Sequence, residues 1–126
     1  MEILIIEATI QTPYICLDPD NNKFEISGKS LPEDADEFYQ PIIQWIDQYV
    51  ENPAPKTDFH FKMDYYNTAS ARYISRIVYT LDKMSEKNKT KIFWYYRTID
   101  EDMESMGDEF YETTNLDFEL VEVQQQ

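Results

Sequence analysis

The spacing of apolar residues predicts that strands and helices alternate along most of the chain. Apolar and polar side chains take turns from Asp58 to Tyr65, which is the period of a half-buried strand. After this run the apolar residues follow the spacing of an amphipathic helix, at Ala71, Ile74, Val78, Leu81 and Met84. The change of period predicts a strand over 57–66 that passes directly into a helix running from Thr68 to about Lys87.

The same patterns predict the remaining elements. Short apolar runs indicate strands at 3–7, 14–17 and 24–26, and the turn formers between the last two runs predict a hairpin. A helix is expected over 34–50, where Pro41 indicates either a start near Gln40 or a bend. Further along, the patterns predict a buried strand at 92–96, a helix at about 101–113 that Gly107 weakens, and a last strand at 117–123.

The order β-β-β-α-β-α-β-α-β predicts an α/β fold. Strands and helices alternate in the second half, and such crossovers join parallel strands. The strands at 57–66 and 117–120 each keep one polar face, so helices should cover mainly one side of the sheet. We therefore expect one domain over 1–126, built on a mixed, mostly parallel sheet with helices mainly on one face.

Composition excludes several classes of partner. The chain of 126 residues has a net charge of −14, so nucleic acid and anionic membranes are poor partners. Cys16 is the only cysteine, which precludes an internal disulfide and fits a reducing compartment. The opening residues do not resemble a signal peptide, and no apolar run reaches the length of a membrane span. These features predict a cytoplasmic protein.

Sets of metal ligands and catalytic groups are largely missing from the sequence. His60 is the only histidine, and the two glycines are too few for a phosphate-binding loop. The turn at 18–22 begins like a calcium loop, but Lys23 and Lys29 occupy its sixth and twelfth positions. We therefore predict no catalytic residue, no metal and no cofactor.

The acidic stretch at 100–112 leaves several interpretations open. Paired carboxylates can perform acid–base chemistry or bind a cation, so the stretch could belong to a small acidic enzyme or a metal-binding protein. Acidic residues are also common at the start of a helix and along a solvated helix face. We prefer the solvated face, which could serve as a docking surface for a basic partner.

Thr68 is the candidate for chemistry at the junction of strand and helix. Its hydroxyl is placed to act as the N-cap of the helix, accepting a hydrogen bond from a free N–H of the first turn. The same position lies at the positive end of the helix dipole, where a phosphate would meet backbone donors. The residues alone leave open whether Thr68 is only a cap or the site of a switch.

Two motifs, Tyr65–Thr68 and Asp100–Phe110, carry a family resemblance, which the segments at 6–9, 32–45 and 118–121 support. In these segments the chain resembles the SiaC family of bacterial biofilm-regulation phosphoproteins, whose fold is like the STAS domains of anti-anti-sigma factors. The resemblance implies that a cognate protein kinase phosphorylates Thr68 and that a metal-dependent serine/threonine phosphatase reverses this step. It also implies that the unmodified form binds and activates a diguanylate cyclase, so the chain would be a non-enzymatic partner-switching regulator.

One departure from the family pattern affects the site. The family tends to carry a run of serines after the threonine, whereas this chain has Ala69, Ser70 and Ala71. Ser70 is therefore the only nearby alternative phosphate acceptor. Candidate residues for partner docking surround this position and include the start of the acidic stretch: Asn67, Ser70, Arg72, Asp100, Glu101 and Asp102. The competing functions are the small acidic enzyme or metal-binding protein and a purely structural subunit.

Overall fold

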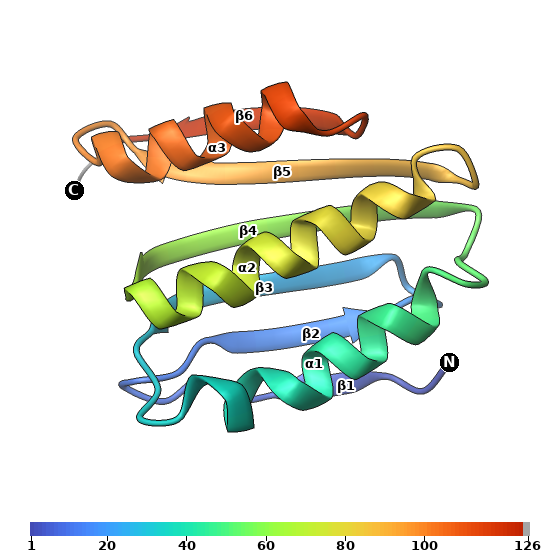
Figure 1. The fold of residues 1–126 in the computed structure, drawn as a ribbon, viewed down its shortest axis with the longest axis horizontal. Helices are drawn as coiled ribbons and strands as arrows, with labels where there is room; N and C mark the ends of the chain where they lie inside the picture. The colour runs from blue at the N-terminus through green and yellow to red at the C-terminus, as the bar shows by residue number, and fades with distance from the viewer. Residues whose placement is uncertain (125–126) are drawn as a thin grey trace.

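The computed structural model describes residues 1–124. Its strands are β1 (Leu4–Ile6), β2 (Tyr14–Asp18), β3 (Lys23–Ser30), β4 (Lys56–Tyr66), β5 (Lys89–Arg97) and β6 (Asp117–Val123) (Figure 1). Its helices are α1 (Ala35–Tyr49), α2 (Thr68–Leu81) and α3 (Glu101–Thr113), with a short 3-10 turn, η1 (Asp82–Met84), after α2. The predicted order of strands and helices is confirmed, including the direct passage from β4 into α2.

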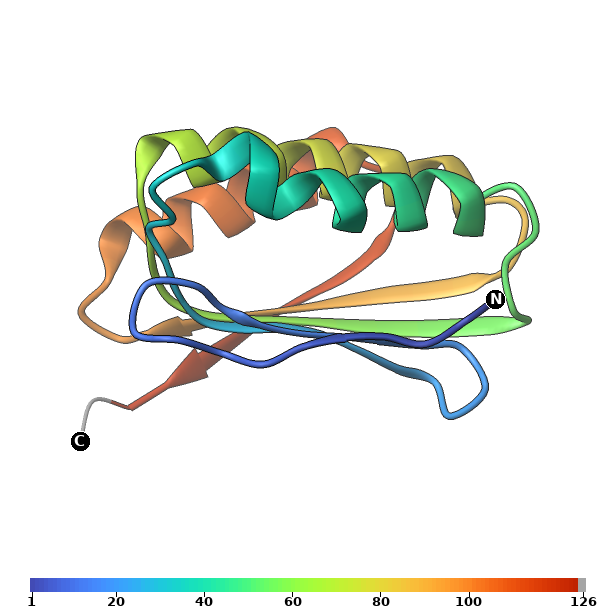
Figure 2. The ribbon, with the colours of Figure 1, turned by 90° about the horizontal axis from the view of Figure 1, so that it is seen from below.

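The strands form one six-stranded sheet in the spatial order β1-β2-β3-β4-β5-β6. The β1–β2 and β2–β3 pairs are antiparallel, while β3–β4, β4–β5 and β5–β6 are parallel. All three helices lie in one layer on the same side of this sheet, and the opposite side is open (Figure 2). The mixed, mostly parallel sheet with one covered face is therefore confirmed, and it follows from crossover helices that each connect neighbouring parallel strands.

The core lies between the sheet and the helix layer. Every second residue of the central strands points into it, as the buried side chains of Phe59 and Phe61 in β4 and of Ile92 and Trp94 in β5 show. Cys16 is also buried, but it lies between the core residues Ile15 and Leu17 of β2 and therefore faces the open side of the sheet, where it lines a hollow with Glu25 and His60. The aromatic content of the chain is concentrated here, and rings such as Phe61 and Trp94 pack with centroids 5.4 Å apart.

Helix α1 begins at Ala35 and continues through Pro41, which confirms the helix predicted over 34–50 and excludes the alternative of a start near Gln40. The Asp34 side chain accepts a hydrogen bond from the backbone N–H of Glu37 and fixes the start of the helix upstream of the proline. The apolar face of α1 then buries five large side chains, Tyr39, Ile42, Ile43, Ile46 and Tyr49. This burial offsets the hydrogen bond that the proline cannot donate.

Gly107 lies in the middle of α3, where its lack of a side chain allows close packing. A Cβ atom at this position would lie 2.4 Å from Cδ1 of Trp94 and 2.5 Å from Cδ2 of Leu120. The helix therefore does not end at the glycine, because the contact with β5 and β6 outweighs its low helix propensity. The Trp94 indole N–H also donates to the carbonyl of Met103 at 2.9 Å, which holds α3 against the sheet.

The sheet opens between β4 and β5 at the carboxyl ends of these strands. Pairing between them stops at Phe61 and Trp94, although β4 stays paired with β3 as far as Tyr66 and β5 with β6 as far as Arg97. The Arg97 guanidinium spans the opening and donates to the backbone carbonyl of Asp64 at 2.9 Å. Helices α2 and α3 both begin at this edge, after β4 and β5 respectively, so their first turns lie beside the opening. Within residues 1–124, none of the helices is long and apolar enough to cross a membrane.

Candidate functional site

The start of α2 and the start of α3 lie at the same edge of the sheet, at the carboxyl ends of β4 and β5 (Figure 1). Tyr66, the last residue of β4, lies near enough to the start of α3 for the charges there to affect its pKa. Burial is the largest cause that raises its pKa to about 12, and the nearby carboxylates of Asp100 and Asp102 add to the effect. The structure therefore brings together the two motifs that the sequence placed more than one element apart.

Asn67 is the N-cap of α2. Its backbone is extended, with φ −83° and ψ 174°, and its side-chain oxygen accepts the backbone N–H of Ser70 at 2.9 Å. Its own N–H donates to the carbonyl of Ser30, the last residue of β3, at 3.0 Å. The prediction that Thr68 caps the helix is wrong, because β3 holds Asn67 in the extended conformation that a cap requires.

Thr68 is the first residue of α2, and its side chain is exposed. Its N–H and that of Ala69 belong to the first turn, whose donors have no carbonyl partner within the helix. The first turn of α2 contains no acidic residue, in contrast to those of α1 and α3. Thr68 thus presents a hydroxyl at a helix N-terminus. No carboxylate in the first turn of α2 offsets the positive potential at this position.

Ser70 lies on the opposite side of the same turn and is fully buried. Its hydroxyl donates to the backbone carbonyl of Ser30 at 3.1 Å and accepts from the Ser30 hydroxyl at 2.8 Å. The Tyr39 hydroxyl lies 2.6 Å from the Ser30 hydroxyl and completes this buried chain. Burial raises the pKa of Tyr39 to about 12, so the phenol stays neutral and can donate. The hydroxyl of Ser70 is thus engaged in the core, which argues against the prediction of Ser70 as a docking residue or alternative acceptor.

The start of α3 is built in the same way but carries charge. Asp100 is the N-cap, and its carboxylate accepts the backbone N–H of Met103 at 3.0 Å. Glu101 and Asp102 follow at exposed positions in the first turn. Carboxylates are favoured here by the helix dipole, which accounts for the acidic start of the 100–112 stretch without catalysis. Among residues 1–124, no group of three or more metal-ligating side chains lies close enough together to hold an ion.

Arg72 is exposed one turn after Thr68 on α2. The sequence-derived candidates Asn67, Thr68 and Arg72 therefore lie on one helix start, and Asp100, Glu101 and Asp102 lie on the adjacent one. Two further residues, Ser30 and Tyr39, form the buried hydrogen-bonded chain that holds Ser70, but they were not predicted. Nothing in the local pattern could reveal them, because Ser30 and Ser70 are separated by 40 positions.

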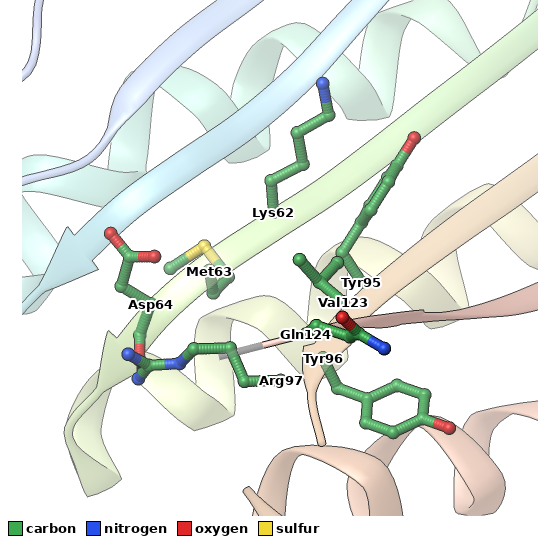
Figure 3. A pocket seen from close by; sticks show the side chains of 8 residues that line it. All are labelled: Lys62, Met63, Asp64, Tyr95, Tyr96, Arg97, Val123 and Gln124. Atoms are coloured by element: carbon green, nitrogen blue, oxygen red, sulfur yellow. Dashed lines mark hydrogen bonds between the residues drawn. The ribbon is translucent and has the colours of Figure 1, made fainter. Parts of the chain in front are cut away.

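A shallow hollow lies beside the opening between β4 and β5 (Figure 3). It has a volume of about 430 Å³ and is lined by Lys62, Met63, Asp64, Tyr95, Tyr96, Arg97, Val123 and Gln124. Arg97 turns toward the β4 side of the hollow, where it meets the Asp64 carbonyl. The lining includes no histidine, cysteine, serine or threonine.

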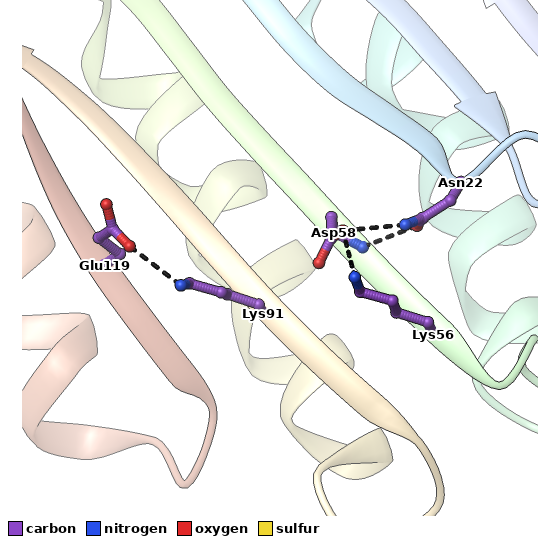
Figure 4. A network of polar contacts seen from close by, with 5 residues as sticks. All are labelled: Asn22, Lys56, Asp58, Lys91 and Glu119. Carbon is purple, nitrogen blue, oxygen red and sulfur yellow. Dashed lines mark hydrogen bonds and ion pairs between the residues drawn. The ribbon is translucent and has the colours of Figure 1, made fainter.

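The open face of the sheet carries charges that are paired with one another. Lys91 contacts Glu119 at 3.0 Å and Lys56 contacts Asp58 at 3.5 Å, while Asn22 donates to Asp58 at 2.9 Å (Figure 4). His60 lies on this face with its Nδ1 atom 2.9 Å from the Tyr95 hydroxyl. Its pKa is lowered first by burial and then by Lys62, and no second histidine exists to join it. The face is a structural network rather than a reaction centre.

Comparison with known proteins decides the family. Residues 6–123 match the model of the SiaC family regulatory phosphoproteins. The chain belongs to the SiaC family. Its membership covers both helix starts and confirms the resemblance noted in the sequence. The family is one of regulatory phosphoproteins, so the role of this member is regulatory and not enzymatic.

Individual relatives agree with this assignment. An uncharacterized protein of Pseudomonas aeruginosa strain UCBPP-PA14 is 23% identical over 121 residues, which cover 95% of this chain and 96% of that protein. The crystal structure of apo-SiaC from Pseudomonas aeruginosa is 22% identical and matches with a TM-score of 0.83 over 96% of this chain and 99% of that one. A second structure, of the diguanylate cyclase SiaD in complex with its activator SiaC from the same species, matches at 22% identity with a TM-score of 0.85, covering 95% and 99% of the two chains. At this identity the structural matches establish the shared fold.

Proposed function

We propose that this chain activates a diguanylate cyclase by binding it, and that phosphorylation of Thr68 ends this binding. A protein kinase adds the phosphate and a metal-dependent serine/threonine phosphatase removes it. The observation that carries the proposal is the exposed Thr68 hydroxyl at the start of α2, in a first turn without carboxylates. A phosphoprotein needs an accessible acceptor, and here the buried Ser70 does not compete for that role.

The start of α2 can receive a phosphate without refolding. Asn67 already caps the helix, so modifying Thr68 leaves the cap in place. The phosphate brings nearly two negative charges to the positive end of the helix dipole, where free backbone N–H groups stabilise it. The helix should therefore remain intact while the surface that a partner meets changes its charge.

The partner class comes from the family. The relative in Pseudomonas aeruginosa, SiaC, is described as the activator of the cyclase SiaD in a complex of the two proteins. The present chain matches that SiaC chain over nearly its full length. We place the exchange in the cytoplasm, which keeps a free thiol such as Cys16 reduced.

The experiment that tests this function measures cyclic di-GMP production by a diguanylate cyclase of the host organism. The cyclase is assayed alone, with the unmodified chain and with the chain phosphorylated stoichiometrically at Thr68. We expect activation by the unmodified chain and by Thr68→Ala, and a loss of activation after phosphorylation of the wild type. Ser105→Ala, at an exposed hydroxyl of α3, is the matched control and should respond to phosphorylation like the wild type. Equal activation by the unmodified and phosphorylated forms would overturn the proposal.

A further inference from the structure

The three helices differ sharply in charge. Helix α1 contains no lysine or arginine, and neither does α3, whereas α2 contains no aspartate or glutamate. The acidic residues of the outer helices are Asp36, Glu37 and Asp47 in α1 and Glu101, Asp102, Glu104, Asp108, Glu109 and Glu112 in α3. Because α2 lies between α1 and α3 in the helix layer, the layer presents a positive row between two negative ones (Figure 1).

The positive row begins at the phosphate acceptor. Thr68, Arg72, Arg76 and Tyr79 of α2 and Lys83 of η1 are all exposed. With about 100° of rotation per residue, these five positions fall within about 80° of one another around the helix axis. We name them the α2 stripe. The stripe combines a modifiable hydroxyl, three cations and the aromatic residue Tyr79, which is 41% exposed.

Contacts to the neighbouring helices show how the stripe is bordered. Arg76 lies 3.6 Å from Asp47 of α1, and the Tyr79 hydroxyl lies 2.7 Å from the Thr113 hydroxyl at the end of α3. About half of each side chain in the Arg76–Asp47 pair is exposed, so the pair contributes little and the arginine can exchange partners. The Arg72 and Lys83 cations extend from the same surface on either side of Arg76.

We propose that the α2 stripe is the surface that binds the cyclase, and that the cyclase docks a segment whose contact face has a central acidic row flanked by basic residues. The proposal rests on the function proposed above. A uniformly acidic partner would be repelled by α1 and α3 in a chain whose net charge is −14. A contact face with the complementary zones matches all three rows at once, which sets the orientation of the partner and rejects partners with other charge patterns. Tyr79 supplies the aromatic anchor that interfaces favour.

The stripe also explains how one phosphate can end binding. A phosphate on Thr68 occupies the first position of the α2 stripe. Arg72, four residues later, lies next to it across one helical turn. Pairing with Arg72 removes a cation from the row, and the remaining charge repels the acidic row of the partner. The partner is released because the charge pattern changes, while the helix itself stays folded.

The first test measures the affinity of the full chain for the cyclase by calorimetry, at low and high salt. Arg72→Glu, Arg76→Glu and Lys83→Glu should each weaken binding by about tenfold or more and reduce its salt dependence. The control is Lys23→Glu, which makes the same charge change at an exposed residue of β3 and should alter the affinity by less than about twofold. If the stripe variants behave like the control while the wild type binds, the docking surface is wrong. If the unmodified wild type fails to bind, the proposed function itself is wrong.

The second test needs no cyclase. The chain phosphorylated at Thr68 is titrated by ³¹P nuclear magnetic resonance in the wild type, in Arg72→Gln and in the control Lys23→Gln. A guanidinium that pairs with the phosphate favours its dianion, so Arg72→Gln should raise the second pKa of the phosphate while Lys23→Gln leaves it unchanged. Equal values in all three proteins would overturn the role of Arg72.

Discussion

The starts of α2 and α3 share one kind of capping hydrogen bond, although the backbone of the cap is extended at Asn67 (ψ 174°) and not at Asp100 (ψ 84°). In each, the cap residue uses a side-chain oxygen to accept the N–H of the third helical residue. Asn67 accepts from Ser70 at 2.9 Å, and Asp100 accepts from Met103 at 3.0 Å. Both helices leave the same edge of the sheet, after neighbouring parallel strands. Each helix start therefore offers a site that favours negative charge.

The two starts differ in charge, because α3 begins with acidic residues and α2 with uncharged ones. The first two residues of α3 are Glu101 and Asp102, whereas those of α2 are Thr68 and Ala69. Helix α3 thus has permanent negative charge where the dipole favours it, and α2 has a hydroxyl that can acquire such charge. The comparison teaches that a regulatory phosphate need not distort this fold, since α3 already shows the charged version of the same helix start.

The largest effect that we predict comes from the third residue of α2, Ser70. Ser70→Ala removes a buried hydroxyl and leaves the Ser30 hydroxyl without its acceptor. It should lower the free energy of unfolding by about 1–3 kcal/mol. Denaturant titration checks this. Thr68→Ala, at the exposed hydroxyl of the same turn, is the control and should stay within about 0.5 kcal/mol of the wild type. Equal losses in both variants would contradict the assignment of Ser70 to the core.

The caps should have similar strengths. Asn67→Ala and Asp100→Ala each remove the acceptor for one N–H and should each cost about 1 kcal/mol of stability. Asn67→Asp and Asp100→Asn keep a capping oxygen and serve as controls. Thermal unfolding of the four variants provides the comparison. A cost at Thr68→Ala that matched Asn67→Ala would move the cap back to Thr68.

Exchanging the first helical residues should have a smaller effect. Thr68→Glu gives α2 the charge that α3 has, and should stabilise the chain by about 0.3–1 kcal/mol at low salt. Glu101→Thr makes the opposite change and should destabilise it by a similar amount. Both effects should shrink in high salt, because the sites are exposed. A destabilising Thr68→Glu would mean that α2 does not tolerate negative charge, contrary to the comparison.

The smallest predicted effect is spectroscopic and tests how close the two starts lie. The double variant Asp100→Asn and Asp102→Asn should lower the pKa of Tyr66 from about 12, yet leave it above 10.0, because burial is the larger cause. Tyrosinate absorbance, compared with that of Tyr66→Phe, isolates this group. A raised tyrosine pKa contributes stability that is present below the unfolded pKa and is lost as the pH rises through the folded value. This loss should therefore begin near pH 10 in both proteins and extend to about pH 12 in the wild type, whereas in the double variant it should end at a lower pH and be smaller.

The sequence predicted the strands, the helices and their order because each element shows a clear apolar period. It misplaced the cap by one residue, because Asn67 and Thr68 are both good caps and only the bond from Asn67 to β3 separates them. It treated Gly107 as a weak point of α3, because its close approach to Trp94 depends on packing between distant segments. Elements with local causes were predictable, and choices made by tertiary contacts were not.

The candidate site followed the same division. Thr68 could be selected because a hydroxyl at a strand-to-helix junction has a local physical meaning. The burial of Ser70 could not be predicted, because its partners come from β3 and α1. The charge difference among the helices is visible in the sequence, but its meaning depends on α2 lying between α1 and α3.

The most direct test of the account is to map phosphate on the chain purified from its native host with phosphatases inhibited. Intact mass and peptide fragmentation should show one phosphate, located on Thr68, and none on Ser70 or on Ser105 of α3. Thr68→Ala should abolish the modified species while leaving the chain folded. Stoichiometric phosphate on Ser70 or Ser105, or its persistence in Thr68→Ala, would contradict the claim that the start of α2 is the regulatory site.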